Sequence, residues 1–131
     1  MSMILLVHPP VAKPCEPPPG IARLAGVLQA NGVPCHVLDA SLEGLLYLME
    51  QAQPGEDRWT HRAVTHRNDH LTALRALPLY SRPDAYRRAV SDLNRLLAKA
   101  GRPSGVTVSL GNYLHADRSP VRSSDLTWAA T

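Results

Sequence analysis

Residues 5–32 read LLVHPPVAKPCEPPPGIARLAGVLQANG, which is the pattern of a strand, a proline-rich loop and an amphipathic helix. Met3–Val7 is a continuous apolar run, typical of a strand that is covered on both faces of a parallel sheet. Proline has no N–H group for strand pairing, so Pro9 ends this strand. The helix is expected to begin near Pro19 or Gly20, because a proline costs little in the first helical turn.

The predicted helix carries one apolar stripe at helical spacing, formed by Ile21, Leu24, Ala25 and Leu28. Gly26 would let the helix lie close to a sheet, and Asn31-Gly32 supplies a left-handed residue that ends it. Val33–Asp39 then reads as a second strand. This order predicts two parallel strands that are joined by a right-handed helical crossover.

Helices are expected to fill the next part of the chain. Ser41 can cap a helix whose apolar stripe runs to Met49. Residues 56–68 are polar and weakly patterned, and a short helix is expected around 71–77. The strongest helical pattern begins at Asp84, and one face of this helix holds Tyr86, Ala89, Val90, Leu93, Leu97 and Ala100.

Val106–Leu110 alternates apolar and polar residues, which predicts a third strand, half exposed or at the edge of the sheet. Residues 111–122 read as loop, and Ser124 can cap a final helix. The predicted fold class is α/β: a partial Rossmann-like (flavodoxin-like) three-layer domain with a small, mostly parallel sheet. A helical insertion at about 41–101 separates strands 2 and 3, and residues 1–131 form a single partial domain.

Composition narrows the classes of function. The 131 residues suffice for one domain, and a hydrophobic content of 44% indicates a globular chain. The net charge is +3 and the arginines are scattered, so we expect no nucleic-acid partner. No apolar run approaches the ~20 residues of a membrane span, and Met1–Val7 is too short for a signal peptide. Two cysteines, Cys15 and Cys35, suit a reducing compartment, so we expect a cytoplasmic protein.

The proline loop lies where open α/β sheets bind their ligands, after the first strand. Proline lacks the backbone N–H, so this loop cannot form the nest of amides that holds a phosphate. A stiff, apolar loop suits a large flat ligand or a partner surface. It is equally suited to be a rigid connector that only sets the angle of the helix, and the residues leave both interpretations open.

Single polar residues near the strand ends have two interpretations each. His8 ends the first strand, where it either touches a ligand or caps local backbone groups. Asp39 begins the sequence D-x-S-x-x-G, one residue away from a D-x-H-x-x-G motif whose histidine ligates cobalt in some cobalamin enzymes. That motif belongs after the first strand, and this stretch follows the second. The simpler interpretation is that Asp39 ends a strand and Ser41 caps a helix.

Three histidines, His61, His66 and His70, raise the question of a metal site. His66 and His70 are four residues apart and would share a helix face. Zinc would need further ligands, and the surrounding segment is polar. We therefore expect solvated histidines, no metal site and, since no nucleophile–base–acid set shows informative spacing, no catalytic residues.

Several segments resemble the N-terminal cobalamin-binding domain of radical S-adenosylmethionine proteins. They are the L-x-x-P-P ending at Leu6–Pro10, PPGIARLAGVLQANG at Pro18–Gly32, and the strand ending in Asp at Val37–Asp39. RPDAYRRAVSDLNRLL followed by VTVSLGNY is similar to the region between the second and third strands of such proteins. The resemblance implies a corrin over the carboxyl ends of the strands, in contact with His8, Pro9, Pro10, Pro19, Gly20 and Asp39.

Two departures from the family shape this expectation. The C-x-x-x-C-x-x-C motif for a 4Fe-4S cluster is absent, and later strands of a five-stranded cobalamin domain are missing. We therefore expect this chain to be an N-terminal fragment of a longer parent protein and not to be catalytic on its own. The parent would be a methyltransferase or a related radical enzyme. The parent's C-terminal radical domain would be its partner and would bind S-adenosylmethionine and the cluster. The alternative is a small, non-catalytic α/β interaction module, and an exposed sheet edge also predicts a homo-oligomer.

Overall fold

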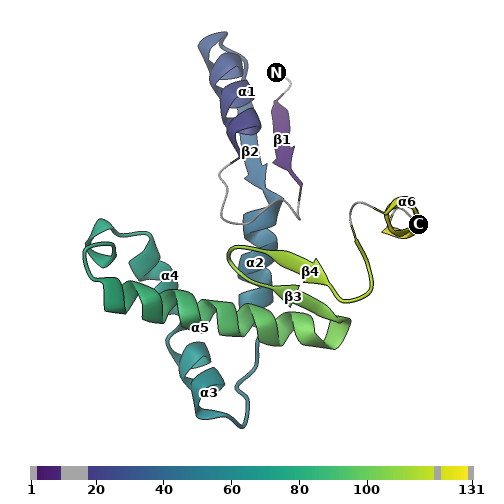
Figure 1. Ribbon diagram of the computed structural model, residues 1–131. Coiled ribbons are helices and arrows are strands. Elements are labelled where there is room, and N and C mark those ends of the chain that lie inside the picture. The colour runs from purple at the N-terminus through teal and green to yellow at the C-terminus, as the bar shows by residue number, and fades with distance from the viewer. Residues whose placement is uncertain (1–2, 10–17, 120–121, 130–131) are drawn as a thin grey trace. The chain divides into compact units, whose positions relative to one another are not determined.

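The computed structural model describes residues 3–9, 18–119 and 122–129 (Figure 1). The chain divides into two compact units, Met1–Tyr47 and Leu48–Thr131. The first unit contains β1, α1, β2 and the start of α2, which are Ile4–His8, Pro19–Ala30, Cys35–Asp39 and Ala40–Gln51. The second unit contains α3 (Arg58–Thr65), α4 (Arg67–Leu74), η1 (Leu77–Leu79), α5 (Pro83–Gly101), η2 (Arg102–Ser104), β3 (Val106–Val108), β4 (Tyr113–His115) and α6 (Ser123–Ala129).

The first unit is a strand-helix-strand crossover. β1 and β2 are parallel and in register, with His8 opposite Asp39, and α1 packs against both strands. Pro19 is the first residue of α1, and Gly32 follows its end with a φ of 68°. The N–H of Gly32 donates to the carbonyl of Gln29 at 3.0 Å, which satisfies one of the helix's last carbonyls. The prediction of two parallel strands joined by one helix is confirmed.

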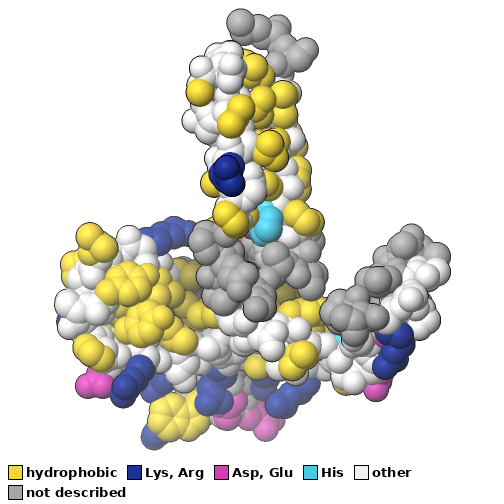
Figure 2. All heavy atoms as spheres, turned by 45° about the horizontal axis from the view of Figure 1, so that its top comes forward, with side chains coloured by type: hydrophobic (Ala, Val, Ile, Leu, Met, Phe, Trp, Pro, Cys, Tyr) yellow, Lys and Arg dark blue, Asp and Glu magenta, His cyan; other side chains and the backbone are white. Residues whose placement is uncertain are grey.

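The sheet of the first unit is thin and open. Leu5 is 54% exposed and Val7 47%, so the expectation that β1 is covered on both faces is wrong for the described residues. In α1, Ala25 is buried, whereas Leu24 and Val27 are more than half exposed. Figure 2 shows hydrophobic side chains (yellow) on the surface of this unit. A two-stranded sheet with one helix offers too few neighbours to bury both of its faces.

α2 follows β2 directly, and its cap differs from the predicted one. The Oδ1 atom of Asp39, not the hydroxyl of Ser41, accepts a hydrogen bond from the N–H of Leu42, at 3.0 Å. Asp39 precedes the first helical residue and therefore occupies the capping position. At the other end of α2, the Nη1 atom of Arg67 donates to the carbonyl of Met49 at 3.1 Å. Both ends of the helix thus have side-chain partners for backbone groups.

α5 is the central helix of the second unit, and α3, α4 and β3 pack against it (Figure 1). The apolar stripe predicted for this helix is largely confirmed, since Ala89, Leu93 and Leu97 are buried. Tyr86, at the start of the stripe, remains 39% exposed. Other core residues of the second unit come from the surrounding elements and from α5 itself: Met49, Ala52, Ala63, Leu79, Leu96 and Val108.

α3 lies in the polar segment for which the sequence shows only a weak pattern. Its buried residues are small, Thr60 and Ala63, and its large apolar residue, Trp59, is 47% exposed. Asp57 caps the helix, because its Oδ1 atom accepts from the N–H of Thr60 at 2.8 Å. Small buried residues carry little hydrophobic signal, which explains why periodicity alone does not predict this helix.

The third predicted strand has a different partner from the one expected. β3 pairs antiparallel with β4, apart from the sheet of β1 and β2, so the prediction of one sheet with three strands is wrong. The expected loop at 111–122 also contains β4. The N–H of Ser109 donates to the carbonyl of Asn112 at 2.9 Å, and the N–H of Asn112 donates to Ser109 Oγ at 2.9 Å. A local turn closes at lower entropic cost than a parallel pairing over a long crossover.

Candidate functional site

The carboxyl ends of β1 and β2 bring two predicted contact residues together. His8 and Asp39 lie opposite each other in the sheet register, and both are partly buried. Pro9 follows His8 directly and is exposed. An imidazole, a carboxylate and an apolar pyrrolidine ring therefore lie at the carboxyl end of the sheet.

Pro19 and Gly20 form the first turn of α1, and both are exposed. A crossover helix starts on the side where its preceding strand ends, so this turn lies at the same end of the unit as His8 (Figure 1). Pro10 lies outside the described residues, as does the rest of segment 10–17.

The strand-end residues fit one edge of a corrin rather than the whole ring. Neighbouring strands are about 4.8 Å apart, which is narrower than a corrin. His8 can donate or accept a hydrogen bond there, while one oxygen of Asp39 already accepts from Leu42 as a helix cap. The polar groups thus suit the amide-bearing rim of a corrin, and further contacts would have to come from other surfaces.

The three histidines have different surroundings. His61 is exposed, and the side chain of His66 is 51% exposed, with Nδ1 3.5 Å from Asp69 Oδ2. His70 is only 15% exposed, and its Nε2 atom lies 3.0 Å from Asp92 Oδ2. The expectation of solvated histidines is therefore wrong for His70. Within the described residues, no three His, Cys, Asp or Glu side chains form a group that could hold a metal.

Asp92 is a buried carboxylate that the sequence interpretation overlooked. Its side chain is 1% exposed, and Arg62 donates to both of its oxygens, from Nε at 3.2 Å and from Nη2 at 2.5 Å. His70 donates to the same carboxylate from Nε2, because an ionised carboxylate can only accept. Burial raises the pKa of Asp92, but the hydrogen bonds from Arg62 and His70 outweigh it and hold the pKa below 3.8.

Arg62 also contacts an aromatic ring. Its guanidinium lies 4.8 Å from the ring centroid of Trp59, and that of Arg58 lies 5.2 Å from the same ring. Arg62 is thus held between an indole of α3 and a carboxylate of α5. Because both oxygens of Asp92 already accept hydrogen bonds from α3 and α4, this carboxylate connects three helices and is not a free base.

Comparison with known proteins gives no match: no family model, no curated protein and no solved structure matches the chain. In the described part of the chain, no helix combines the length and the apolar composition that a membrane span requires. The function proposed next therefore rests on the strand-end geometry and on the segments quoted above.

Proposed function

We propose that this chain is the N-terminal cobalamin-binding region of a radical S-adenosylmethionine enzyme, a methyltransferase or a related radical enzyme. The observation that carries the proposal is the pairing of His8 with Asp39 at the carboxyl edge of a parallel strand-helix-strand unit. Open α/β sheets bind their ligands at this edge. The proposed corrin contacts are His8, Pro9, Pro10, Pro19, Gly20 and Asp39.

In the proposed parent protein, this chain would bind cobalamin and a separate radical domain would carry out the radical chemistry. The sequence has two cysteines, Cys15 and Cys35, which cannot supply a C-x-x-x-C-x-x-C motif. The radical domain would therefore bind the cluster and S-adenosylmethionine, and this chain alone would not be catalytic. Bound cobalamin would supply a transferable methyl group, while His8 and Asp39 would orient its polar rim.

The narrow sheet supports weak binding by this chain alone. Two strand ends contact only part of a wide, flat ring, so most of the corrin would remain in water. Contacts from the rest of the parent would complete the site. We accordingly propose that the parent binds cobalamin tightly and that the isolated 131 residues bind it weakly or not at all.

The test is a titration of hydroxocobalamin, followed by visible absorption, into the parent protein and into this chain. We expect the parent to bind with a Kd of about 1 μM and the chain at least a hundredfold more weakly. In the parent, His8→Ala and Asp39→Asn should each weaken binding about tenfold. Asn keeps an oxygen that can cap α2, and His36→Ala in the middle of β2 is the matched control.

Two outcomes would contradict the proposal. One is a parental reading frame that lacks the C-x-x-x-C-x-x-C motif. The other is a parent that binds no cobalamin although circular dichroism shows it to be folded. Micromolar binding to a monomeric 131-residue chain would instead refute the requirement for further contacts.

A second candidate function is a small, non-catalytic interaction module. The observation that favours it is the exposed apolar surface of the first unit, where Leu5, Leu24 and Val27 are 54%, 55% and 60% exposed. Large exposed apolar patches usually mark surfaces that a partner covers. A parental frame without the cluster motif, together with no cobalamin binding, would favour this function over the first.

A further inference from the structure

A basic hollow of about 380 Å³ lies on the surface of the second unit, between α5 and the start of α3. Two cationic side chains of α5, Arg95 and Lys99, line it together with Arg102 of η2 and a single carboxylate, Asp57. Arg95 and Lys99 are four residues apart and share one face of α5, and Arg102 follows the helix directly. All four residues belong to the second unit, and the hollow is separate from the strand-end site.

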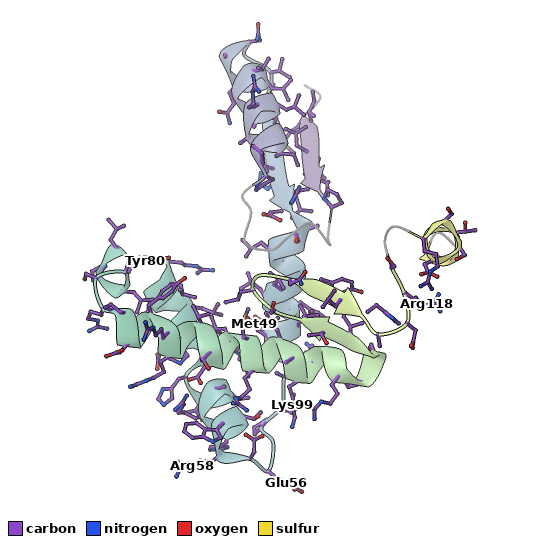
Figure 3. The ribbon with its side chains drawn as sticks, in the orientation of Figure 1. Met49, Glu56, Arg58, Tyr80, Lys99 and Arg118 are labelled. Atoms are coloured by element: carbon purple, nitrogen blue, oxygen red, sulfur yellow. The ribbon has the colours of Figure 1, made fainter. Side chains whose placement is uncertain are left out.

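The lysine forms part of the wall of this basic hollow. Figure 3 shows Lys99 extending from α5 toward the segment that leads into α3. Its Nζ atom would be 3.0 Å from a Cβ at Gly55, and Asp57 Oδ2 would be 3.3 Å from the same point. The ammonium group therefore lies against the chain that enters α3.

The charges in the basic hollow do not balance. Asp57 Oδ1 accepts from the N–H of Thr60 at 2.8 Å and lies 3.9 Å from Nη1 of Arg95. The hydrogen bonds with Thr60, followed by the charges of Lys99 and Arg95, hold the pKa of Asp57 below 3.8, so the carboxylate is ionised at neutral pH. Within the described residues, Lys99 and Arg102 form no ion pair shorter than 4 Å.

The basic hollow also contains neutral hydrogen-bond donors. Ser91 and Asn94, which carry a hydroxyl and an amide, also line the basic hollow. The Oδ1 atom of Asn94 accepts from the N–H of Leu110 at 2.7 Å, which fixes the amide and leaves its Nδ2 group as a donor. Three cations around one carboxylate, with additional N–H and O–H donors, are groups that bind phosphate oxygens.

We propose that the basic hollow binds the phosphate group of a small phosphorylated molecule. A nucleic acid would require a long stripe of cations, whereas these three all lie between positions 95 and 102. The group recognised would be a phosphate. Inorganic phosphate, a phosphomonoester and a diphosphate all carry it, so the binding of these three is compared. The inference does not depend on cobalamin binding, because none of its residues belongs to the first unit.

The test is calorimetric titration of the full chain with inorganic phosphate, glucose 6-phosphate and pyrophosphate at low ionic strength. We expect saturable binding of at least one probe, weakened at least tenfold by the double change Arg95→Gln and Lys99→Gln. The matched control is Arg87→Gln with Arg88→Gln, which removes two exposed charges from α5 outside the hollow. Ser91→Ala changes no charge and should weaken binding about threefold.

Circular dichroism and a thermal melt of each variant separate lost binding from lost folding. An equal loss in both double variants would overturn the proposal, because diffuse charge would then explain the binding. Absence of binding to the unmodified chain at about 10 mM of every probe would also overturn it. So would tighter binding of a single-stranded oligonucleotide that Arg87→Gln with Arg88→Gln abolishes, since this points to an extended nucleic-acid surface.

Discussion

At the scale of single residues, Asp92 joins three helices through one carboxylate. It lies on α5, is 1% exposed, and accepts from Arg62 of α3 and His70 of α4. Removing one partner of a buried ion pair costs more than the pair contributes, because the remaining charges lose their compensation. Here the loss is moderated, since the side chain of Arg62 is 35% exposed and water can solvate it.

We predict that Asp92→Asn lowers the free energy of unfolding by about 2 kcal/mol at pH 7 and flattens its dependence on pH. The folded-state pKa of Asp92 is below its unfolded value, so its contribution is present above about pH 4. That contribution is lost as the pH falls through the folded-state pKa. Urea unfolding between about pH 2 and pH 7 would measure both effects.

The control for this prediction is Asp69→Asn. Asp69 is 83% exposed and lies 3.5 Å from His66, so its removal should change the unfolding free energy by less than about 0.5 kcal/mol. Equal losses of stability in the two variants, or an unchanged pH dependence of unfolding in Asp92→Asn, would contradict the prediction that Asp92 holds the three helices together.

At the scale of elements, the end of α5 lies very close to the start of β3. A Cβ at Gly101 would collide with the carbonyl oxygen of Val106 and lie 3.3 Å from a methyl carbon of Val108. The obstacle is backbone, which cannot move aside as a flexible side chain can. Glycine is therefore required here by the close approach of two elements, not by its dihedral angles.

We predict that Gly101→Ala lowers the free energy of unfolding by about 1–3 kcal/mol, because the hairpin must shift to admit the methyl group. Gly26→Ala in α1 is the opposite case. Its Cβ would meet none of the described residues within 4 Å, so the expectation that Gly26 allows a close approach to the sheet is wrong for this part of the chain. Alanine there should stabilise the helix by about 0.5–1 kcal/mol.

Thermal and urea unfolding of both glycine variants would test this contrast. A neutral or stabilising Gly101→Ala would show that β3 is free to move away from the end of α5. A destabilising Gly26→Ala would indicate that another surface covers α1.

At the scale of the whole molecule, the open sheet of the first unit favours association with another chain. β1 and β2 pair only with each other among the described strands, so each keeps an unpaired edge. Val7 and Leu5 of β1 are about half exposed. Unpaired edges with apolar side chains are templates for pairing with another chain.

We predict that the 131-residue chain self-associates through this sheet, which light scattering at about 100 μM would detect. Val7→Lys should shift the chain toward monomer, because a lysine on an edge strand opposes pairing. Leu77→Lys is the matched control, since Leu77 is 85% exposed and belongs to the second unit. A strictly monomeric chain, or an equal effect of both lysines, would contradict the prediction.

The candidate site is predictable from sequence only in part. His8 and Asp39 could be named because each ends a recognisable strand, and parallel strands bring their carboxyl ends together. The contacts of Asp92 with Arg62 and His70 could not be predicted, because these residues lie 30 and 22 positions away along the chain. An acid one helical turn from the apolar residues Ala89 and Leu96 was the available signal, and it indicates a buried partner without saying which.

The sequence by itself determined the local elements: the parallel crossover of the first unit, the end of α1 at Gly32, and the apolar face of α5. Periodicity, proline and glycine act within a few residues, so they can be read directly. Only the tertiary structure decided that β3 stays out of the sheet of β1 and β2, and that α3 and α5 together line a basic hollow. Such features depend on which surfaces meet, and burial and pairing between distant segments are not encoded by local preference.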